Sequence, residues 1–397
     1  MAVTCTALHS RTTEIFPVRV RFSSFLGLLT CAAVLAALAG CDGATTAGPD
    51  AALGDGLFDR DPEWASATAS FWRWFPDEGM RCRDSSATGY GLRRELDSRD
   101  LLIVLQTGGA CFDSTSCATN DARYNAASFN TFKRGKGTRG IYADSASNPF
   151  RGWNTIMVPY CTGDVHGGDT TSVEVPGVPG THQFVGYRNL DAMLQRIAWQ
   201  ARNATRVVVA GGGFAVTLTY GLTAERLAPA PVHFLADAGP IPPGDSVLTP
   251  ALQQRWRDLW DLDAALPDGC TDCSQPDGDG LEHILPYYAS TYPDRYFGLV
   301  SHMDDPKNRA IFGVDNTNCV VSGDGSCRVP LDDFTDGLYG IRSMLGGSPN
   351  AGTFYVPERG HVSFTVEDKF YEMAIDSLYM TQWIKDLIDG AVVNAGP

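Results

Sequence analysis

The sequence predicts an α/β domain in which helices cover both faces of a mostly parallel sheet. Two observations predict this fold class. Short apolar runs rich in β-branched residues alternate along the chain with longer amphipathic segments, and glycines follow several of the apolar runs. Hydrophobic residues make up 44% of the 397 residues, which is enough for a large core. Without repeats or a second composition regime, one domain over residues 62–397 is the simplest organisation.

Six apolar runs have the composition expected of strands buried on both faces of a parallel sheet. They are residues 100–106, 153–159, 205–209, 231–237, 295–301 and 352–356. Six amphipathic segments have the spacing of helices: 186–203, 214–227, 246–262, 281–292, 331–345 and 377–391. In such a sheet the functional side chains are expected in the loops that follow the carboxyl ends of the strands.

The N-terminal 40 residues have the composition of an export signal. Three arginines precede an apolar run over residues 22–38, and the run ends in Leu-Ala-Gly-Cys, similar to a bacterial lipobox. Cleavage before Cys41 would leave a lipid-bearing cysteine and a flexible tether over 41–61, and so a membrane-anchored lipoprotein of the periplasm or cell surface. The alternatives are an ordinary signal peptide with a coincidental cysteine and, less favoured, an uncleaved membrane anchor, because Ser and Thr interrupt a short run.

Cysteine usage agrees with export. Eight cysteines remain beyond the signal and the lipidation position: Cys82, Cys111, Cys117, Cys161, Cys270, Cys273, Cys319 and Cys327. An even number fits an oxidising compartment. Two local pairs stand out, 111/117 and 319/327, while 270 and 273 can close on each other or exchange with 319 and 327. A zinc site at 270 and 273 is the rival interpretation, but no second Cys or His pair lies at metal-site spacing.

The formal charge of −15 and the pI of about 4.8 argue against nucleic acid or an anionic membrane as a partner held by charge. Membrane contact is therefore expected through the lipid alone. The chain is expected to be a monomer.

The stretch 205–218, TRVVVAGGGFAVTL, has the pattern of a strand, a glycine turn and a helix. A strained strand–turn–helix of this kind carries the nucleophilic serine in G-x-S-x-G enzymes, and here the corresponding position is Gly213, followed by Phe214. A phosphate-binding loop of a dinucleotide fold is the other interpretation. It fails because Val216 stands where G-x-G-x-x-G/A requires a small residue, and because two strands already precede this unit.

Three other post-strand loops carry groups that complete a hydrolytic site. Gly108, Gly109 and Ala110 follow the first strand, and their N–H groups can face a developing oxyanion. His302-Met303-Asp304-Asp305 and Glu358-Arg359-Gly360-His361 follow two later strands. The order of elbow, acid and histidine is the order of α/β-hydrolases. Each piece alone is weak, because a single post-strand histidine is more often structural and paired aspartates are usually a helix cap.

These and other segments resemble the pectin acetylesterase family, which includes the Notum carboxylesterases. The segments that carry the resemblance are LLIVLQTGGACFDSTSC (101–117), WNTIMVPYCTGDVHGGD (153–169), VGYRNLDAMLQRI (185–197), FLADAGP (234–240), YPDRYFGLVSHMDD (292–305) and VPERGH (356–361). The resemblance implies an α/β-hydrolase fold, hydrolysis of esters on carbohydrate or lipidated protein, and a Ser-Asp-His triad without metal or other cofactor. It also implies a disulfide between Cys82 and Cys161.

Transferred residue by residue, the resemblance makes Asp304 the acid, His361 the base, and the N–H groups of Gly109, Ala110 and Phe214 the oxyanion hole. The serine does not transfer, because the family reads G-x-S-A-G-G where this chain has Gly213. FLADAGP likewise places Ala238 where the family has serine. Thr217 lies about one helical turn, ~6 Å, beyond the elbow and is too far to replace the serine at the same donors.

Two functions follow from this pattern. The first is an exported lipoprotein that has lost most ester hydrolysis and keeps a cleft for a small-molecule or polysaccharide ester. The second is an active hydrolase in which His361 and Asp304 activate a water, or in which another residue is the nucleophile. The first is favoured, because removal of a triad leaves only ~10³–10⁴-fold catalysis over water in a well-studied case.

Overall fold

The computed structural model describes residues 56–275 and 279–397, and within this part the main element is an eight-stranded mixed sheet. Its strand order is β1-β2-β4-β3-β7-β8-β9-β12. The strands are β1 (Trp72–Arg81), β2 (Ala87–Arg93), β3 (Asp100–Leu105), β4 (Asn154–Val158), β7 (Arg206–Gly212), β8 (Val232–Asp237), β9 (Phe297–Asp304) and β12 (Ala351–Arg359). All pairs from β4 through β12 are parallel, which confirms the α/β fold class and the six predicted strands.

The antiparallel hairpin of β1 and β2 extends one side of the sheet and was absent from the sequence-based prediction. Three two-stranded pairs are also present: β5 (Thr170–Glu174) with β6 (Thr181–Phe184), β10 (Val320–Val321) with β11 (Cys327–Arg328), and β13 (Ala374–Ile375) with β14 (Leu378–Tyr379). None of these short pairs belongs to the central sheet.

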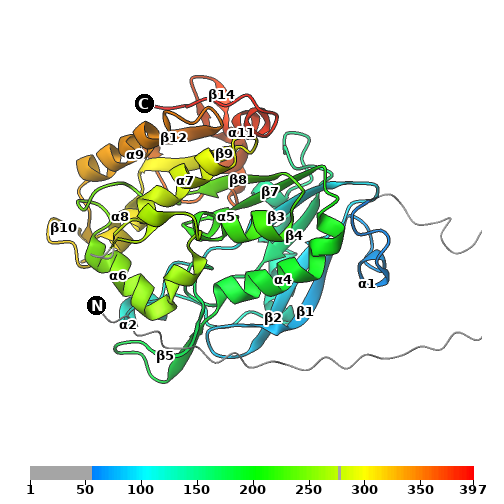
Figure 1. Ribbon diagram of the computed structural model, residues 1–397, viewed down its shortest axis with the longest axis horizontal. Helices are drawn as coiled ribbons and strands as arrows, with labels where there is room; N and C mark the ends of the chain where they lie inside the picture. The colour runs from blue at the N-terminus through cyan, green and yellow to red at the C-terminus, as the bar shows by residue number, and fades with distance from the viewer. Residues whose placement is uncertain (1–55, 276–278) are drawn as a thin grey trace, which may run out of the picture. The chain divides into compact units, whose positions relative to one another are not determined.

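Helices pack on both faces of the sheet, as Figure 1 shows. The longer ones are α4 (Gly186–Ala201), α5 (Ala215–Arg226), α6 (Pro250–Trp260), α7 (Ile284–Thr291), α9 (Leu331–Leu345) and α11 (Met380–Ile388), matching the six predicted helical segments. The shorter ones are α1 (Pro62–Ala65), α2 (Ser114–Ala118), α3 (Ala126–Phe132), α8 (Pro306–Phe312) and α10 (Glu367–Glu372). No described helix is long and apolar enough to cross a membrane.

The two faces of the sheet bury two separate apolar clusters. Along β3, Ile103 and Leu105 enter the cluster shared with α4, α5, α7 and α9, while Leu102 and Val104 enter the cluster shared with α3, α10 and α11. Successive side chains of a strand point to opposite faces, so a strand with helices on both sides is apolar throughout. This explains why the sequence signal of the central strands is a continuous apolar run.

The described fold begins before the expected start at residue 62. Leu57 and Phe58 are buried in the core, and the buried Asp59 forms an ion pair with Arg94. The segment 57–61, expected to belong to the tether, is therefore part of the domain, because its two apolar side chains find a place in the core. The signal, Cys41 and the tether up to residue 55 lie outside the described residues.

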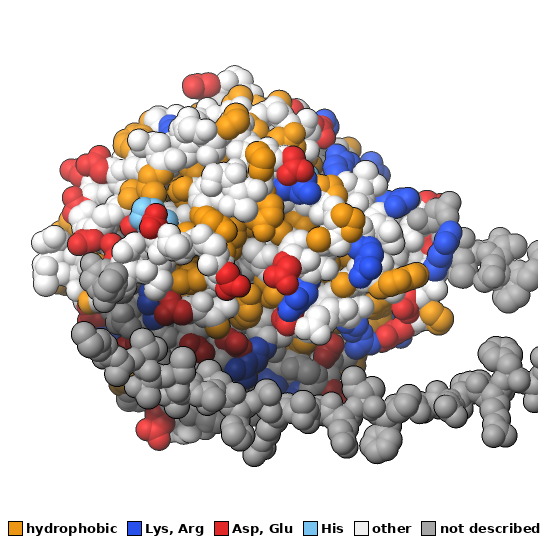
Figure 2. Space-filling model, viewed as in Figure 1, with side chains coloured by type: hydrophobic (Ala, Val, Ile, Leu, Met, Phe, Trp, Pro, Cys, Tyr) orange, Lys and Arg blue, Asp and Glu red, His pale blue; other side chains and the backbone are white. Residues whose placement is uncertain are grey.

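The described residues contain four disulfides, and all four agree with the expected pairs: Cys82–Cys161, Cys111–Cys117, Cys270–Cys273 and Cys319–Cys327. They place the folded chain in an oxidising, extracytoplasmic setting. In the view of Figure 2, hydrophobic side chains gather near the middle of the face, and acidic and basic groups are scattered around them.

Candidate active site

The turn between β7 and α5 has the geometry of a nucleophile elbow. Gly213 follows the last residue of β7 with φ +63°, and the helix begins two residues later. Its N–H donates to the carbonyl of Asp237 at 3.0 Å, which ties the turn to the end of β8. Gly239 lies so close that a Cβ there would be 2.0 Å from the Gly213 carbonyl oxygen. Two adjacent strand ends therefore hold the elbow.

The elbow has open space where a side chain would project. A Cβ built on Gly213 has no heavy atom within 4 Å, whereas one on the neighbouring Gly212 would lie 2.4 Å from Thr107. Only backbone strain opposes a side chain at Gly213, because L-residues other than glycine seldom adopt this φ. The elbow therefore has room for a side chain, although the residue at this position is glycine.

Three residues that line the elbow cavity have backbone N–H groups without a hydrogen-bond acceptor in the described part of the chain. Those of Gly109, Ala110 and Phe214 donate no hydrogen bond to any atom in the described ranges, and all three residues line one cavity with Gly213. Phe214 is the N-cap of α5, so its N–H lies at the positive end of a helix dipole. Such a set of free N–H groups can stabilise a negatively charged oxygen.

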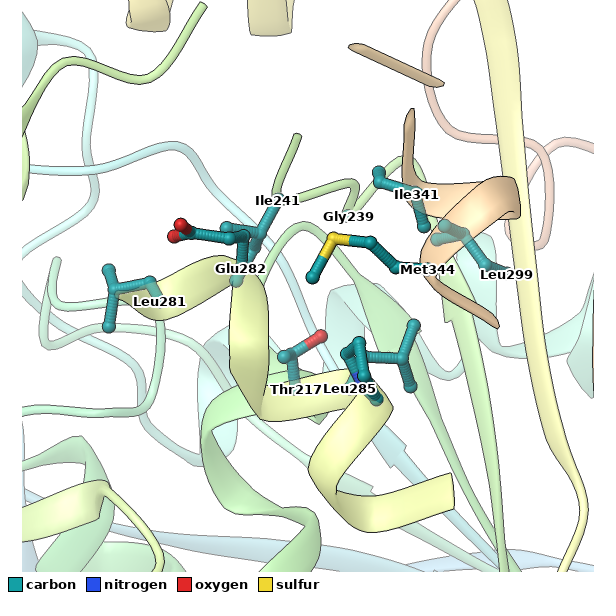
Figure 3. Close-up of a pocket in the computed structure, with 10 residues that line it drawn as sticks. Thr217, Gly239, Ile241, Leu281, Glu282, Leu285, Leu299, Ile341 and Met344 are labelled. Atoms are coloured by element: carbon teal, nitrogen blue, oxygen red, sulfur yellow. The ribbon is translucent and has the colours of Figure 1, made fainter. Parts of the chain in front are cut away.

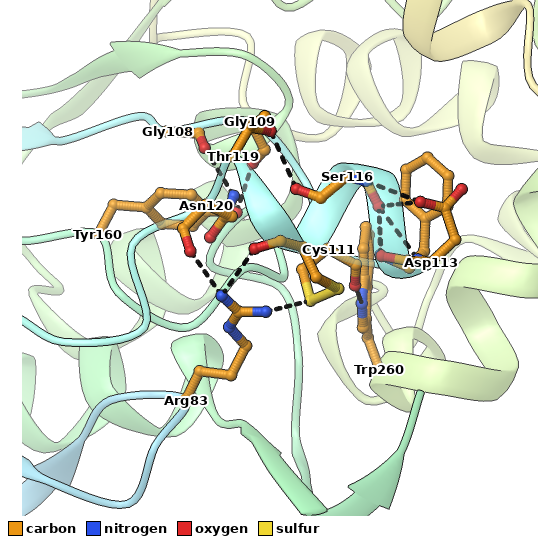
Figure 4. The surroundings of a disulfide bond; sticks show 12 residues. Arg83, Gly108, Gly109, Cys111, Asp113, Ser116, Thr119, Asn120, Tyr160 and Trp260 are labelled. Carbon is orange, nitrogen blue, oxygen red and sulfur yellow. Dashed lines mark hydrogen bonds between the residues drawn. A yellow bond between two sulfur atoms is a disulfide. The ribbon is translucent and has the colours of Figure 1, made fainter. Parts of the chain in front are cut away.

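Side chains around the Cys111–Cys117 disulfide orient the glycine loop, as Figure 4 shows. The Asn120 amide donates to the Gly108 carbonyl at 2.6 Å, and the Tyr160 hydroxyl donates to the Gly109 carbonyl at 2.6 Å. Because N–H and C=O of a trans peptide point in opposite directions, these bonds turn the next N–H groups, of Gly109 and Ala110, away from Asn120 and Tyr160. The loop is thereby fixed before any ligand binds.

An imidazole–carboxylate pair lies on the other side of the elbow cavity. His361 Nδ1 is 2.9 Å from Asp305 Oδ2 and 3.1 Å from Oδ1. The Asp305 side chain is fully buried and also accepts from the N–H groups of Lys307 and Asn308 and from the Asn308 amide. Since the carboxylate accepts from Nδ1–H, Nε2 of neutral His361 keeps its lone pair and can act as a base.

The prediction that Asp304 is the partner of His361 is wrong, and the partner is the next residue. Asp304 forms an ion pair with Arg309 at 2.6 Å and lies 3.7 Å from Arg359. It ends β9, whereas Asp305 is the N-cap of α8 with Pro306 at the first helical position. Neighbouring residues at a strand end point in opposite directions, so only one of the two aspartates can face His361.

A buried carboxylate holds the loop that carries His361. Asp237, at the end of β8, accepts from the N–H groups of Ser363 and Phe364 at 2.6 and 2.7 Å. Burial raises the pKa of Asp237 to about 6, because desolvation outweighs these two hydrogen bonds. This aspartate lies in the FLADAGP segment, but the sequence pattern predicted no role for it.

The elbow cavity also contains a second imidazole that the sequence analysis missed. His166 lines it, and its Nε2 donates to the Gln106 carbonyl at 2.8 Å. Burial lowers the pKa of His166 to about 4, so it is neutral at pH 7. The buried Asp164 accepts from the His166 N–H and from Gly186 at the start of α4, and desolvation raises its pKa to about 6. In the structure, His166 has a positive φ of +61°, a conformation that is often found at functional sites.

The cavity that these groups share is small, about 40 Å³. At roughly 10–15 Å³ per water, it holds about three waters, a volume similar to an acetyl group. Phe214 is one of the residues that line it, and the Phe214 ring packs on Phe312 and Trp256 in the core. Ile311 closes another wall. The arrangement therefore admits a small acyl group at the elbow.

The helical Thr217 is not part of this cavity. It lines a separate apolar cavity of about 10 Å³ between α5 and the segment that leads into α7, where Leu281, Leu285 and Ile341 surround it (Figure 3). Thr217 therefore lies away from the elbow cavity, as its position along the helix predicts. Ala238 has φ +56° and its carbonyl accepts from Asn308, so it supports α8.

A mostly parallel sheet, a sharp strand–turn–helix at its carboxyl edge and a carboxylate–imidazole pair beside that turn define the α/β-hydrolase class. The sequence pattern of the pectinacetylesterase family matches residues 70–304, more than half of the chain. The chain belongs to the pectinacetylesterase family.

Proteins similar to this chain include Notum carboxylesterases. Palmitoleoyl-protein carboxylesterase NOTUM of Homo sapiens is 29% identical over 176 residues, covering 40% of this chain and 34% of that protein. Inactive palmitoleoyl-protein carboxylesterase notum1b of Danio rerio is 31% identical over 111 residues, 26% of this chain and 77% of that protein. The chain matches about a third of the length of the Notum proteins from Xenopus laevis and Homo sapiens.

The crystal structure of the Wnt deacylase Notum from Drosophila has the same fold. It superposes with a TM-score of 0.56 at 19% identity, over 81% of this chain and 93% of that chain. At this identity the likeness concerns the fold alone.

Proposed function

We propose that glycine has replaced the elbow serine in this member of the family. The protein would then bind a carboxylic ester but hydrolyse it poorly or not at all. The observation that supports the proposal is Gly213, which has the elbow conformation and no nucleophile. Around it remain the free N–H groups of Gly109, Ala110 and Phe214 and the His361–Asp305 pair. These are the groups that recognise an ester carbonyl and its tetrahedral form.

The ligand expected at the elbow is a small carboxylic ester, on a carbohydrate or another alcohol. The cavity of about 40 Å³ fits an acetyl group and is too small for a long acyl chain. The description of the zebrafish relative as inactive is compatible with loss of hydrolysis within the family.

A second function is favoured by one observation, the intact His361–Asp305 pair. His361 Nε2 has no protein partner in the described ranges, and it lines the same cavity as Gly213. A water at the vacated serine position would donate its proton to Nε2 while its oxygen attacks the ester carbonyl. The products would be the carboxylic acid and the free alcohol, without a covalent intermediate.

We further propose that the chain is held at the membrane by a lipid on Cys41, in the periplasm or at the cell surface, and that it is a monomer. The lipobox-like sequence at 38–41 supports the anchor, and the disulfides are compatible with export. Under this proposal the folded domain contacts the membrane only through the tether.

Hydrolysis of 4-nitrophenyl acetate by the purified protein tests the two functions. Under the first, the parent and a His361→Asn variant hydrolyse the ester equally slowly, at the rate of a denatured control. Under the second function, the parent hydrolyses the ester faster than the denatured control does, and the His361→Asn replacement removes this activity. Binding of a non-hydrolysable acetyl analogue, measured by calorimetry, is expected under both, so failure to bind would contradict both proposals.

A further inference from the structure

The second histidine of the elbow cavity has a ring nitrogen that can accept a hydrogen bond. His166 lines the cavity and is only 2% exposed. Its Nε2 lies 2.8 Å from the Gln106 carbonyl oxygen, which cannot donate, so Nε2 carries the proton. Burial lowers the pKa of His166 to about 4, so the ring is neutral at pH 7 and Nδ1 keeps a lone pair.

Nδ1 of His166 has no partner in the described part of the chain. No described group donates to it, and it is not one of the buried polar atoms that are sealed from solvent. A lone pair inside a folded protein is expected to accept a hydrogen bond, because a polar atom that leaves water without a partner loses free energy. Since the ring adjoins the elbow cavity, we expect the donor to be a molecule in that cavity.

The backbone around His166 is strained and closely held. Val165 has φ +50° and His166 has φ +61°, a conformation that residues other than glycine seldom adopt. The Val165 N–H donates to the Tyr160 hydroxyl at 2.9 Å, and the same hydroxyl donates to the Gly109 carbonyl. At the start of α4, a Cβ on Gly186 would lie 2.6 Å from the His166 Cα. One tyrosine therefore holds both the His166 segment and the glycine loop with its free N–H groups.

The polar groups of the elbow cavity do not match an ester alone. An ester offers oxygens to the free N–H groups at the elbow, but it has no N–H or O–H for an imidazole lone pair. Two such lone pairs line the cavity, on His361 Nε2 and on His166 Nδ1. A water molecule has two protons and supplies one to each. The elbow has space for it, since no heavy atom lies within 4 Å of the Cβ position of Gly213.

We propose that His166 and His361 together hold the attacking water of an ester hydrolase, in the space that a serine side chain would fill. This role rests on the second proposed function, in which hydrolysis proceeds without a covalent intermediate. One O–H of the water donates to His361 Nε2 and the other donates to His166 Nδ1. Both protons are then held, and an oxygen lone pair is directed at the ester carbon.

The reaction follows from this arrangement. The water oxygen bonds to the ester carbon while His361 takes one proton, and the carbonyl oxygen becomes an oxyanion at the free N–H groups. The proton bonded to His166 stays on the attacking oxygen and becomes the O–H of the carboxylic acid. When the tetrahedral form collapses, the C–O bond to the alcohol breaks and His361 returns its proton to the alcohol oxygen.

Hydrolysis of 4-nitrophenyl acetate by the full chain tests this role. His166→Leu removes the lone pair and should lower kcat by about 10- to 100-fold, because the water loses one of its two fixed hydrogen bonds. Binding of 4-nitrophenylacetone, the ketone in which CH₂ replaces the ester oxygen, should change less than about twofold, because the acyl group makes no hydrogen bond to His166.

Two amide variants distinguish hydrogen bonding from packing. Asparagine places its amide oxygen near the Nδ1 position, whereas glutamine places its amide near the Nε2 position. His166→Asn should therefore keep more activity than His166→Gln, which restores only the bond to Gln106.

His233→Leu is the matched control. His233 is 4% exposed, burial lowers its pKa to about 4, and its Nδ1 accepts from the Tyr296 N–H. It lies in β8 and does not line the elbow cavity, so its replacement should leave kcat unchanged.

The role of His166 and the hydrolysis on which it depends fail in different ways. If the parent hydrolyses the ester no faster than His361→Asn does, the second function and this role both fail. If hydrolysis depends on His361 but His166→Leu is as fast as the parent, only the role of His166 is refuted. Equal losses of kcat and of ketone affinity in His166→Leu, or more activity in His166→Gln than in His166→Asn, would also refute it.

Discussion

Replacement of Gly213 by serine tests the physical interpretation of the elbow. The added Cβ meets no heavy atom within 4 Å, so the cost is confined to the backbone at φ +63°. A left-handed conformation costs a non-glycine residue roughly 1–2 kcal/mol. Removing glycine from the unfolded chain returns about 0.4–1 kcal/mol. The net loss of stability is therefore roughly 0.5–1.5 kcal/mol, which lowers Tm by about 1–2 °C in a domain of this size.

The same replacement should restore hydrolysis. The new hydroxyl stands in the cavity that His361 and the free N–H groups of Gly109 and Ala110 line. A nucleophile accounts for up to ~10⁶ in kcat in a mature serine hydrolase, so even an imperfectly placed serine should raise kcat/KM for 4-nitrophenyl acetate by at least about 10². A burst of 4-nitrophenol equal to the enzyme concentration would report the acyl-enzyme.

Gly213→Ala is the matched control, because it adds the same Cβ and backbone strain without an oxygen. It should lower Tm as much as serine does and leave the hydrolysis rate at the parent's value. Longer esters should respond less than acetate, since the elbow cavity has a volume of only about 40 Å³. If the serine and alanine variants are as stable as the parent and equally inactive, residue 213 is not an elbow position and the hydrolase interpretation of this site fails.

Three further results are expected. In the Gly213→Ser background, Asp305→Asn should lower kcat by about 10²–10⁴, because it disturbs the His361 tautomer, while Asp304→Asn should change kcat less than about threefold; equal effects would contradict the assignment of Asp305. The pKa of Asp237 is about 6 in the folded protein against 3.8 for a free aspartate. Its contribution to stability is therefore full below pH 4 and is lost as the pH rises through 6, so from pH 7 to pH 5 the parent should gain roughly 1 kcal/mol over Asp237→Asn in urea unfolding; parallel pH profiles would refute this. Cys41→Ser should move the protein from the membrane to the soluble exported fraction or leave its signal uncleaved, and unchanged membrane fractionation would rule out the lipid anchor.

Most of the sheet could be predicted from the sequence, because strands buried on both faces are apolar throughout. The hairpin of β1 and β2 could not be predicted, because its glycines are required by close packing that the sequence does not show. A Cβ on Gly91 would lie 2.4 Å from the Phe129 ring, and one on Gly89 would lie 2.1 Å from the Phe75 carbonyl oxygen. Glycine, and Pro76 within β1, lower the strand propensity that a sequence shows.

The site was predictable to the level of loops but not of single atoms. The order of elbow, acid and histidine identified the three loops, yet two adjacent aspartates compete for one place and only the direction of β9 at its end decides between them. The signal that favoured Asp305 was Pro306, since proline at the first helical position makes the preceding aspartate the N-cap.

The groups that remain around Gly213 bear on whether the site still binds. The N–H groups of Gly109, Ala110 and Phe214 have no protein acceptor within the described residues, and hydrogen bonds from Asn120 and Tyr160 hold the glycine loop in one conformation. The open state of these N–H groups, together with the His361–Asp305 pair, favours a site that still receives a carbonyl or carboxylate oxygen.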